Sequence, residues 1–199
     1  QYKYIKDNVC QKRFLKNTDR SNSLWMTPIE GSKALFVTED PLDAIAHSQL
    51  FPGARYAYLC TGGTSTKAQR EMIHSFSQKF KLPIILGNDN DLAGQLENFK
   101  LAYHTANIEY AINSKTQRVL LTVNGAEREW GKDEIVAALQ AVMKQRPNMI
   151  LSIPWAKDWN DDLRSSKKSI SLRIAENMAR VQIETTKSEQ RGMIAGKLP

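Results

Sequence analysis

Residues 82–94 of this chain read LPIILGNDNDLAG, a short apolar run that leads directly into two aspartates, Asp89 and Asp91. In an extended backbone, residues two positions apart point to the same side, so both carboxylates can face one ion. Carboxylate oxygens suit Mg²⁺ or Mn²⁺, which takes one or two protein carboxylates and leaves its other positions to water and phosphate. Asp, Asn and Gly are also common in turns and helix caps, so the motif alone leaves a structural interpretation open.

A second apolar run, residues 34–38 (ALFVT), also ends in acidic residues, Glu39 and Asp40. Neither run alternates apolar and polar residues, which is typical of parallel strands buried on both faces. A helical pattern follows each run, so we expect an α/β fold with a short, Rossmann-like parallel sheet flanked by helices. Because parallel strands end at the same edge of such a sheet, where ligands bind, Glu39, Asp89 and Asp91 are expected to converge there.

A glycine pair lies between a predicted strand at residues 55–60 and a predicted helix at residues 67–80. Glycines before a helix N-terminus expose backbone N–H groups that bind phosphate. Gly62, Gly63 and the neighbouring Lys67 are therefore candidate phosphate-binding residues. The same residues also make an ordinary turn followed by an N-cap, and both interpretations stay open.

The pattern changes after the helix that follows Asp91. Residues 109–130 alternate apolar and polar residues around Asn124-Gly125, a strong signal for a β-hairpin, and residues 132–146 read as a helix. We interpret residues 107–147 as an inserted β-hairpin plus helix. Its expected role is to enlarge one rim of the site or to form a partner surface, because nothing in it resembles catalytic machinery.

Residues 148–154 predict a fourth strand, and acidic residues again follow it. Judged from the residues alone, Asp161 and Asp162 cap the next turn and helix, and Asp162 is expected to be solvated. Near the N-terminus, residues 23–26 predict an edge strand. Trp25 in that strand is expected to pack against the core, with base stacking as the alternative.

The net charge of +7 is concentrated in the two flanks of the chain. Residues 1–20 hold six basic against two acidic residues, and residues 164–199 hold eight against three. Basic flanks can bind the phosphates of single-stranded DNA or RNA, whereas an acidic centre suits a cation. Basic tails are also often simply solvated, so the nucleic-acid interpretation is one of two.

The composition predicts an intracellular, cytoplasmic protein with no membrane partner. The 199 residues suffice for one domain with appendages, and no stretch resembles a membrane span or a signal peptide. Cys10 and Cys60 form no CxxC pair and are expected to be free thiols.

Four segments of the chain together resemble a known family. They are, in order, residues 37–44 (VTEDPLDA), 60–69 (CTGGTSTKAQ), 85–94 (ILGNDNDLAG) and 157–163 (KDWNDDL). This ordered set resembles the Toprim domain of bacterial primases, topoisomerases and some nucleases. It is most similar to the Toprim variants in primase-like proteins of plasmids, phages and conjugative elements, and the resemblance spans about residues 35–163.

The resemblance implies site residues and a cofactor. Glu39 takes the position of the family's glutamate, and Asp89 and Asp91 take those of its paired aspartates; these three are the expected catalytic residues. The same residues, with Asp158 added, are the expected ligands of Mg²⁺ or Mn²⁺. Lys157 is expected to contact phosphate. One departure is that Asp40 stands where the family often has a small residue.

The resemblance also implies a domain organisation. We expect a basic N-terminal extension (residues 1–30), a Toprim-like domain (31–168) and a basic C-terminal helix and tail (169–199). The expected function is metal-dependent phosphoryl transfer on nucleic acid, most specifically nucleotidyl transfer from nucleotides in a primase-like protein of a mobile element. The abrupt start at Gln1 leads us to expect a fragment that normally works beside other replication or mobilisation domains.

Two other functions stay open on the sequence. Cleavage of DNA by a nuclease or a topoisomerase would use the same acidic residues, although a topoisomerase also needs a nucleophilic tyrosine. A non-catalytic nucleic-acid-binding module of a mobilisation protein would keep the acidic residues as a structural cation site.

Overall fold

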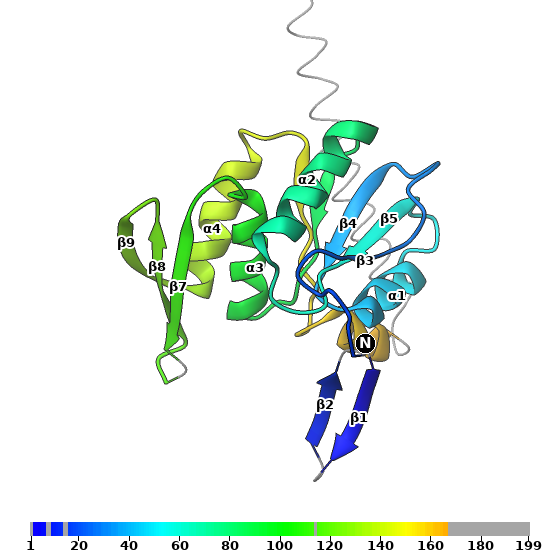
Figure 1. Cartoon of the computed structure of the whole chain (residues 1–199), viewed down its shortest axis with the longest axis horizontal. Helices are drawn as coiled ribbons and strands as arrows, with labels where there is room; N and C mark the ends of the chain where they lie inside the picture. The colour runs from blue at the N-terminus through cyan, green and yellow to red at the C-terminus, as the bar shows by residue number, and fades with distance from the viewer. Residues whose placement is uncertain (1, 7–8, 14–15, 114, 167–199) are drawn as a thin grey trace, which may run out of the picture. The chain divides into compact units, whose positions relative to one another are not determined.

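The computed structural model describes residues 2–6, 9–13, 16–113 and 115–166 (Figure 1). In chain order its elements are β1 (Tyr2–Lys6), β2 (Val9–Arg13), β3 (Trp25–Met26), β4 (Ala34–Thr38), α1 (Pro41–Leu50), β5 (Tyr56–Cys60), α2 (Lys67–Phe80), β6 (Ile84–Leu86), α3 (Leu92–Ala102), β7 (Ile108–Asn113), β8 (Arg118–Val123), β9 (Ala126–Gly131), α4 (Lys132–Met143), β10 (Met149–Leu151) and α5 (Trp159–Ser166). The chain divides into two units, Gln1–Asp162 and Leu163–Pro199, and the β-sheets of the described residues all lie in the first.

The central sheet has five strands in the order β10-β6-β4-β5-β3. Strands β10, β6, β4 and β5 are mutually parallel, and only β3 is antiparallel to its neighbour. All five residues of β4 are buried, as a strand covered on both faces requires. The predicted α/β fold with a parallel sheet between helices is therefore confirmed.

The two faces of the sheet bury different kinds of side chain. Leu35 and Val37 of β4 belong to the main aliphatic core, together with Ile73 of α2 and residues of α3, β8 and α4. Phe36 points to the opposite face, where its ring centroid lies 3.9 Å from that of His47 on α1. Both layers are needed to hold the parallel strands in place, because such strands bury both of their faces.

The insertion forms a three-stranded antiparallel sheet in the order β7-β8-β9, followed by α4 (Figure 1). Asn124 and Gly125 adopt φ values of 50° and 85°, as the predicted two-residue turn requires. Val119 and Leu121 of β8 are fully buried in the main core. The expected hairpin and helix are present, and β7 adds a third strand.

The N-terminal part differs from one expectation. The predicted edge strand is present as β3, which pairs with β5, but Trp25 is 42% exposed, so the prediction that it packs in the core is wrong. A two-residue edge strand gives its side chains little cover. The helix predicted within residues 169–199 lies outside the described residues. In the described part of the chain, no helix is both long and apolar enough to cross a membrane.

Candidate functional site

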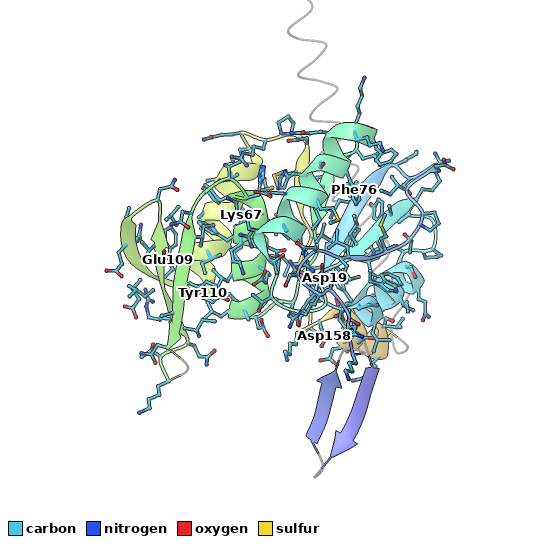
Figure 2. The ribbon with its side chains drawn as sticks, in the orientation of Figure 1. Asp19, Lys67, Phe76, Glu109, Tyr110 and Asp158 are labelled. Atoms are coloured by element: carbon cyan, nitrogen blue, oxygen red, sulfur yellow. The ribbon has the colours of Figure 1, made fainter. Side chains whose placement is uncertain are left out.

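The predicted acidic residues follow three adjacent parallel strands. Glu39 follows β4, Asp89 and Asp91 follow β6, and Asp158 lies between β10 and α5. Because β6 pairs with β4 on one side and with β10 on the other, the three strands end side by side at one edge of the sheet. Figure 2 shows Asp158 at this edge, apart from Lys67 on α2.

The loop after β6 is tied to the start of α3. Asp91 is the N-cap of this helix, and its Oδ1 accepts a hydrogen bond of 2.9 Å from the backbone N–H of Gly94. The fully buried Gln95 donates from Nε2 to the backbone carbonyl oxygen of Asp89 at 2.8 Å. The structural interpretation of the motif therefore has support, because Asp91 caps the helix with one oxygen. Metal binding by the motif stays a prediction.

The β10–α5 loop is hydrogen-bonded to the loop after β6. The backbone N–H of Asn90 donates to the Lys157 carbonyl at 2.7 Å, and its side-chain amide donates to the Pro154 carbonyl at 3.1 Å. Lys157 Nζ lies 4.0 Å from Asp91 Oδ2. Asn90 thus holds the β10–α5 loop, which carries Lys157 and Asp158, against the loop after β6.

Asp162 is 4% exposed, so the prediction that it is solvated is wrong. Its two carboxylate oxygens accept hydrogen bonds from the backbone N–H groups of Trp155 and Ala156, at 2.8 and 2.7 Å. Asp158 Oδ1 accepts from the N–H of Asp161 at 2.8 Å. Asp162 therefore holds the shape of the loop that carries Lys157.

Asp43 belongs to the acidic group, although sequence reasoning did not select it. It lies in the first turn of α1, is 6% exposed, and accepts a hydrogen bond of 2.6 Å from the side-chain amide of Asn160. The helix starts where it does because Asp40 caps it, accepting from the Leu42 N–H at 2.9 Å. The only sequence signal was the spacing of four residues between Glu39 and Asp43.

The pKa of Asp89 is raised to about 7. Burial is the main cause, and repulsion from Asp43, Glu39, Asp91 and Asp158 adds to it. Among the described residues, no three His, Cys, Asp or Glu side chains are already gathered closely enough to hold a metal ion. The donor oxygens are the kind that Mg²⁺ and Mn²⁺ prefer, and a cation would offset their repulsion, so the residues fit a divalent ion.

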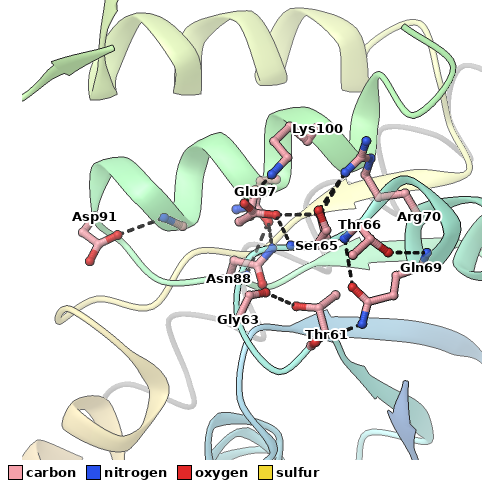
Figure 3. Close-up of polar contacts among 12 residues, drawn as sticks. Thr61, Gly63, Ser65, Thr66, Gln69, Arg70, Asn88, Asp91, Glu97 and Lys100 are labelled. Atoms are coloured by element: carbon pink, nitrogen blue, oxygen red, sulfur yellow. Dashed lines mark hydrogen bonds and ion pairs between the residues drawn. The ribbon is translucent and has the colours of Figure 1, made fainter. Parts of the chain in front are cut away.

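The glycine loop before α2 runs beside Glu39. The Gly62 N–H donates to the Glu39 backbone carbonyl at 2.8 Å, and Gly62 and Gly63 have φ values of 75° and 128°, which favour glycine. Thr66 caps α2 through the Gln69 N–H at 3.1 Å, and the Gln69 side chain bonds back to Thr66 (Figure 3). The ordinary-cap interpretation thus has support, and phosphate contact at the two glycines stays a prediction.

Lys67 is the first residue of α2, and its side chain is 75% exposed. Its Nζ lies 3.8 Å from Glu71 Oε1 in a surface ion pair one turn along the helix. Such a pair contributes little to stability and leaves the ammonium free to change partner. Phosphate contact by Lys67 also stays a prediction.

A buried polar network fixes the glycine loop to α3 (Figure 3). Glu97 Oε2 accepts from both the backbone N–H and the hydroxyl of Ser65, at 2.9 and 2.6 Å, and its other oxygen lies 2.6 Å from Lys100 Nζ. Arg70 donates to the Ser65 carbonyl at 2.9 Å. Because Glu97 uses both carboxylate oxygens within the network and is paired with Lys100, the network positions the loop, and we assign it no chemistry.

The insertion contributes a cation that the sequence did not point to. Lys132, the first residue of α4, lies with its Nζ 3.3 Å from Asn90 Oδ1 and 3.5 Å from the Asn90 carbonyl oxygen. Lys132 and Lys157 therefore both reach the loop that carries Asp89 and Asp91. Lys132 is therefore the residue through which the insertion reaches the rim of the candidate site.

Gly94 allows the close approach of α3 to Asp89. A Cβ at position 94 would lie 2.7 Å from the Asp89 backbone nitrogen and closer still to its carbonyl oxygen, and backbone atoms cannot move aside as a side chain can. We expect Gly94→Ala to lower the free energy of unfolding by about 1–3 kcal/mol. Chemical denaturation measures this, with Gly53→Ala as the control, since no atom lies within 4 Å of a Cβ there. Equal stability of both variants would contradict the packing argument.

Comparison with known families gives one match. Residues 36–119 match a family model described as Toprim-like. Comparisons with curated proteins and with solved structures gave no significant match. The matched residues run from β4 into β8 and contain Glu39, Asp89 and Asp91, whereas Lys132 and Asp158 lie beyond them. With the parallel sheet and the acidic strand ends described above, this match shows that the chain carries a Toprim-like domain.

Proposed function

We propose that this chain carries out metal-dependent phosphoryl transfer on nucleic acid, and that the reaction is primase-type nucleotidyl transfer. The observation that carries the proposal is the gathering of acidic side chains from three adjacent strand ends around Asp89 in a Toprim-like domain. Toprim-like domains in general act on nucleic acid and bind divalent metal ions. Two lysines beside an acidic cluster suit a phosphate that is bound with such an ion.

The proposal assigns a role to each acidic residue. Glu39, Asp89, Asp91 and Asp158 are the ligands for Mg²⁺ or Mn²⁺, which when bound neutralises phosphate charge and activates a hydroxyl. In this proposal, Glu39 has a second role as general acid or base.

In this proposal, phosphate is bound at the same loop. Lys132 and Lys157 hold it, because both approach the Asn90 loop and neither is committed to a buried ion pair. Gly62, Gly63 and Lys67 would extend this phosphate path along the edge of the sheet. The ligands and the lysines together orient a phosphate against the acidic group, which is the positioning that phosphoryl transfer requires.

A topoisomerase-type reaction has less support. Tyr58, on β5, is buried, and its hydroxyl lies 2.9 Å from His47 Nδ1. Burial raises the pKa of Tyr58 well above its usual range, which is the opposite of what an activated nucleophile needs. The role in a primase-like protein of a mobile element rests on the resemblance of residues 37–44 and 157–163.

Two assays run side by side test the proposal. One measures nucleotide incorporation on a single-stranded template, and the other measures nicking of a supercoiled plasmid, each with Mg²⁺, with Mn²⁺ and with a chelator. Metal-dependent incorporation supports the primase-type reaction, and metal-dependent nicking alone would instead select a nuclease. If neither product forms although the chain binds single strands, the domain is a binding module and the proposal is wrong.

A further inference from the structure

Trp155 is the most exposed large hydrophobic side chain of residues 16–113 and 115–166, at 51%. It lies in the β10–α5 loop, at the edge of the sheet where the acidic residues gather. Trp159, four residues later, is only 3% exposed and donates from its indole nitrogen to the Gly87 carbonyl at 2.8 Å. The two tryptophans therefore have different environments: Trp159, at the start of α5, is in the core, and Trp155 is half exposed.

The backbone that carries Trp155 is held in place on both sides. Its own N–H and that of Ala156 donate to the buried carboxylate of Asp162, and the carbonyl of Pro154 accepts from the Asn90 side chain at 3.1 Å. Pro154 is itself buried. An exposed ring on a fixed backbone loses little conformational freedom when it binds a flat partner, which favours affinity.

The fixed loop places Trp155 next to the candidate site. Pro154, which bonds to Asn90, is one step of about 3.8 Å along the chain from Trp155. Lys157, two residues beyond, bonds to Asn90 through its carbonyl and has a side chain that is 64% exposed. An exposed indole and an exposed ammonium are thus two residues apart in one loop, at the acidic edge of the sheet.

From this arrangement we propose that Trp155 is a stacking platform for an unpaired base of single-stranded nucleic acid. The inference rests on the proposed function and adds a binding contact to the same site. Proteins that bind single strands combine cations along the phosphate backbone with aromatic rings on which bases stack. Lys157 and Lys132 supply the cations beside Asn90, and Trp155 supplies the ring. A base stacked there would set the register of the strand relative to the acidic residues.

A pair of matched oligonucleotides tests the inference on the full chain. One is a fluorescently labelled oligothymidine of about 12 nucleotides, and the other is an abasic strand with the same number of phosphates. Fluorescence anisotropy should show that the wild-type chain binds the oligothymidine roughly five- to a hundredfold more tightly. Trp155→Ala should remove this preference and leave the affinity for the abasic strand unchanged, whereas Trp155→Phe should keep most of it.

Two control variants separate stacking from other effects. Trp25→Ala removes another exposed tryptophan, on β3, which is the outermost strand on the side of the central sheet away from β10. This variant should keep the preference. Lys157→Ala should weaken binding of both strands by the same factor.

If Trp155→Ala fails to fold, a second measurement takes its place: the quenching of tryptophan emission when the oligothymidine binds. This quenching should be lost in Trp155→Phe but not in Trp25→Phe.

The outcomes distinguish this inference from the function on which it rests. Equal binding of the two strands by the wild-type chain, or a preference that survives in Trp155→Ala, overturns the stacking role and leaves the proposed function standing. Binding of neither strand contradicts both. A preference that depends on Trp155 supports the stacking role whether or not the chain forms a product.

Discussion

Glu39→Gln is expected to reduce metal-dependent product formation on the order of 10²- to 10⁴-fold while leaving the affinity for single-stranded nucleic acid unchanged or slightly raised. The substitution keeps the size of the side chain and removes one negative charge beside the phosphate path. The contact with the glycine loop survives, because Gly62 donates to the backbone carbonyl of residue 39 and not to its side chain. A loss of turnover with binding intact is the signature of a group that acts mainly in the transition state.

The measurement uses the incorporation and nicking assays, with binding followed by anisotropy in the same buffer. Glu71→Gln is the matched control, since it removes an exposed carboxylate that pairs with Lys67 on α2. We expect that control to keep full activity. Wild-type turnover in Glu39→Gln would show that the carboxylate takes no part in the chemistry, and a parallel loss of binding and turnover would assign it a structural role instead.

Strands and helix starts were predictable from the sequence because their signals are local. Residues 34–38 are uniformly apolar and form a strand buried on both faces, as expected. The start of α2 at Lys67 follows from Thr66 and Gln69, whose spacing is that of a capping box, and the structure contains both of its hydrogen bonds. The approach of Glu39, Asp89 and Asp91 to one edge follows from the parallel order of their strands.

The supporting residues of the site were not predictable, because they depend on contacts between distant segments. Lys132 reaches Asn90 across 42 positions of sequence, and nothing in its own segment indicates that contact. Asp162 looks like a solvated residue in a polar run, yet it is buried because two backbone N–H groups of the preceding loop point at it. Asp43 was missed because the orientation of α1 alone brings it near Asp89.

The affinity of the chain for Mg²⁺ or Mn²⁺ is expected to fall about tenfold for each pH unit below 7 and to level off above it. The reason is competition with a proton, because the pKa of Asp89 is raised to about 7 by burial and by the neighbouring carboxylates, and the ion requires the deprotonated form. Isothermal titration between pH 5.5 and 8.5 measures this. Asp89→Asn and Asp91→Asn should both weaken binding, but only Asp89→Asn should also remove the pH dependence near 7.

The raised pKa of Asp89 also predicts how the stability of the metal-free chain depends on pH. The folded-state pKa of Asp89 lies above its unfolded value of 3.8, so the folded chain holds the proton more tightly, and this contribution to stability is lost as pH rises towards and through 7. His47 and His74 act in the opposite sense, because burial lowers their pKa values to about 3 and about 4, and their contribution is lost as pH falls below 6.5. The difference between wild type and Asp89→Asn isolates the aspartate.

In chelator, Asp89→Asn should therefore gain stability relative to wild type as pH rises from 5 to 8, and saturating Mg²⁺ should stabilise wild type more than the variant at pH 8. Thermal unfolding with and without Mg²⁺ gives both comparisons. A stability difference that does not change with pH would mean that Asp89 titrates normally and is not crowded by its acidic neighbours. Equal stabilisation of wild type and Asp89→Asn by Mg²⁺ would place the ion elsewhere on the chain.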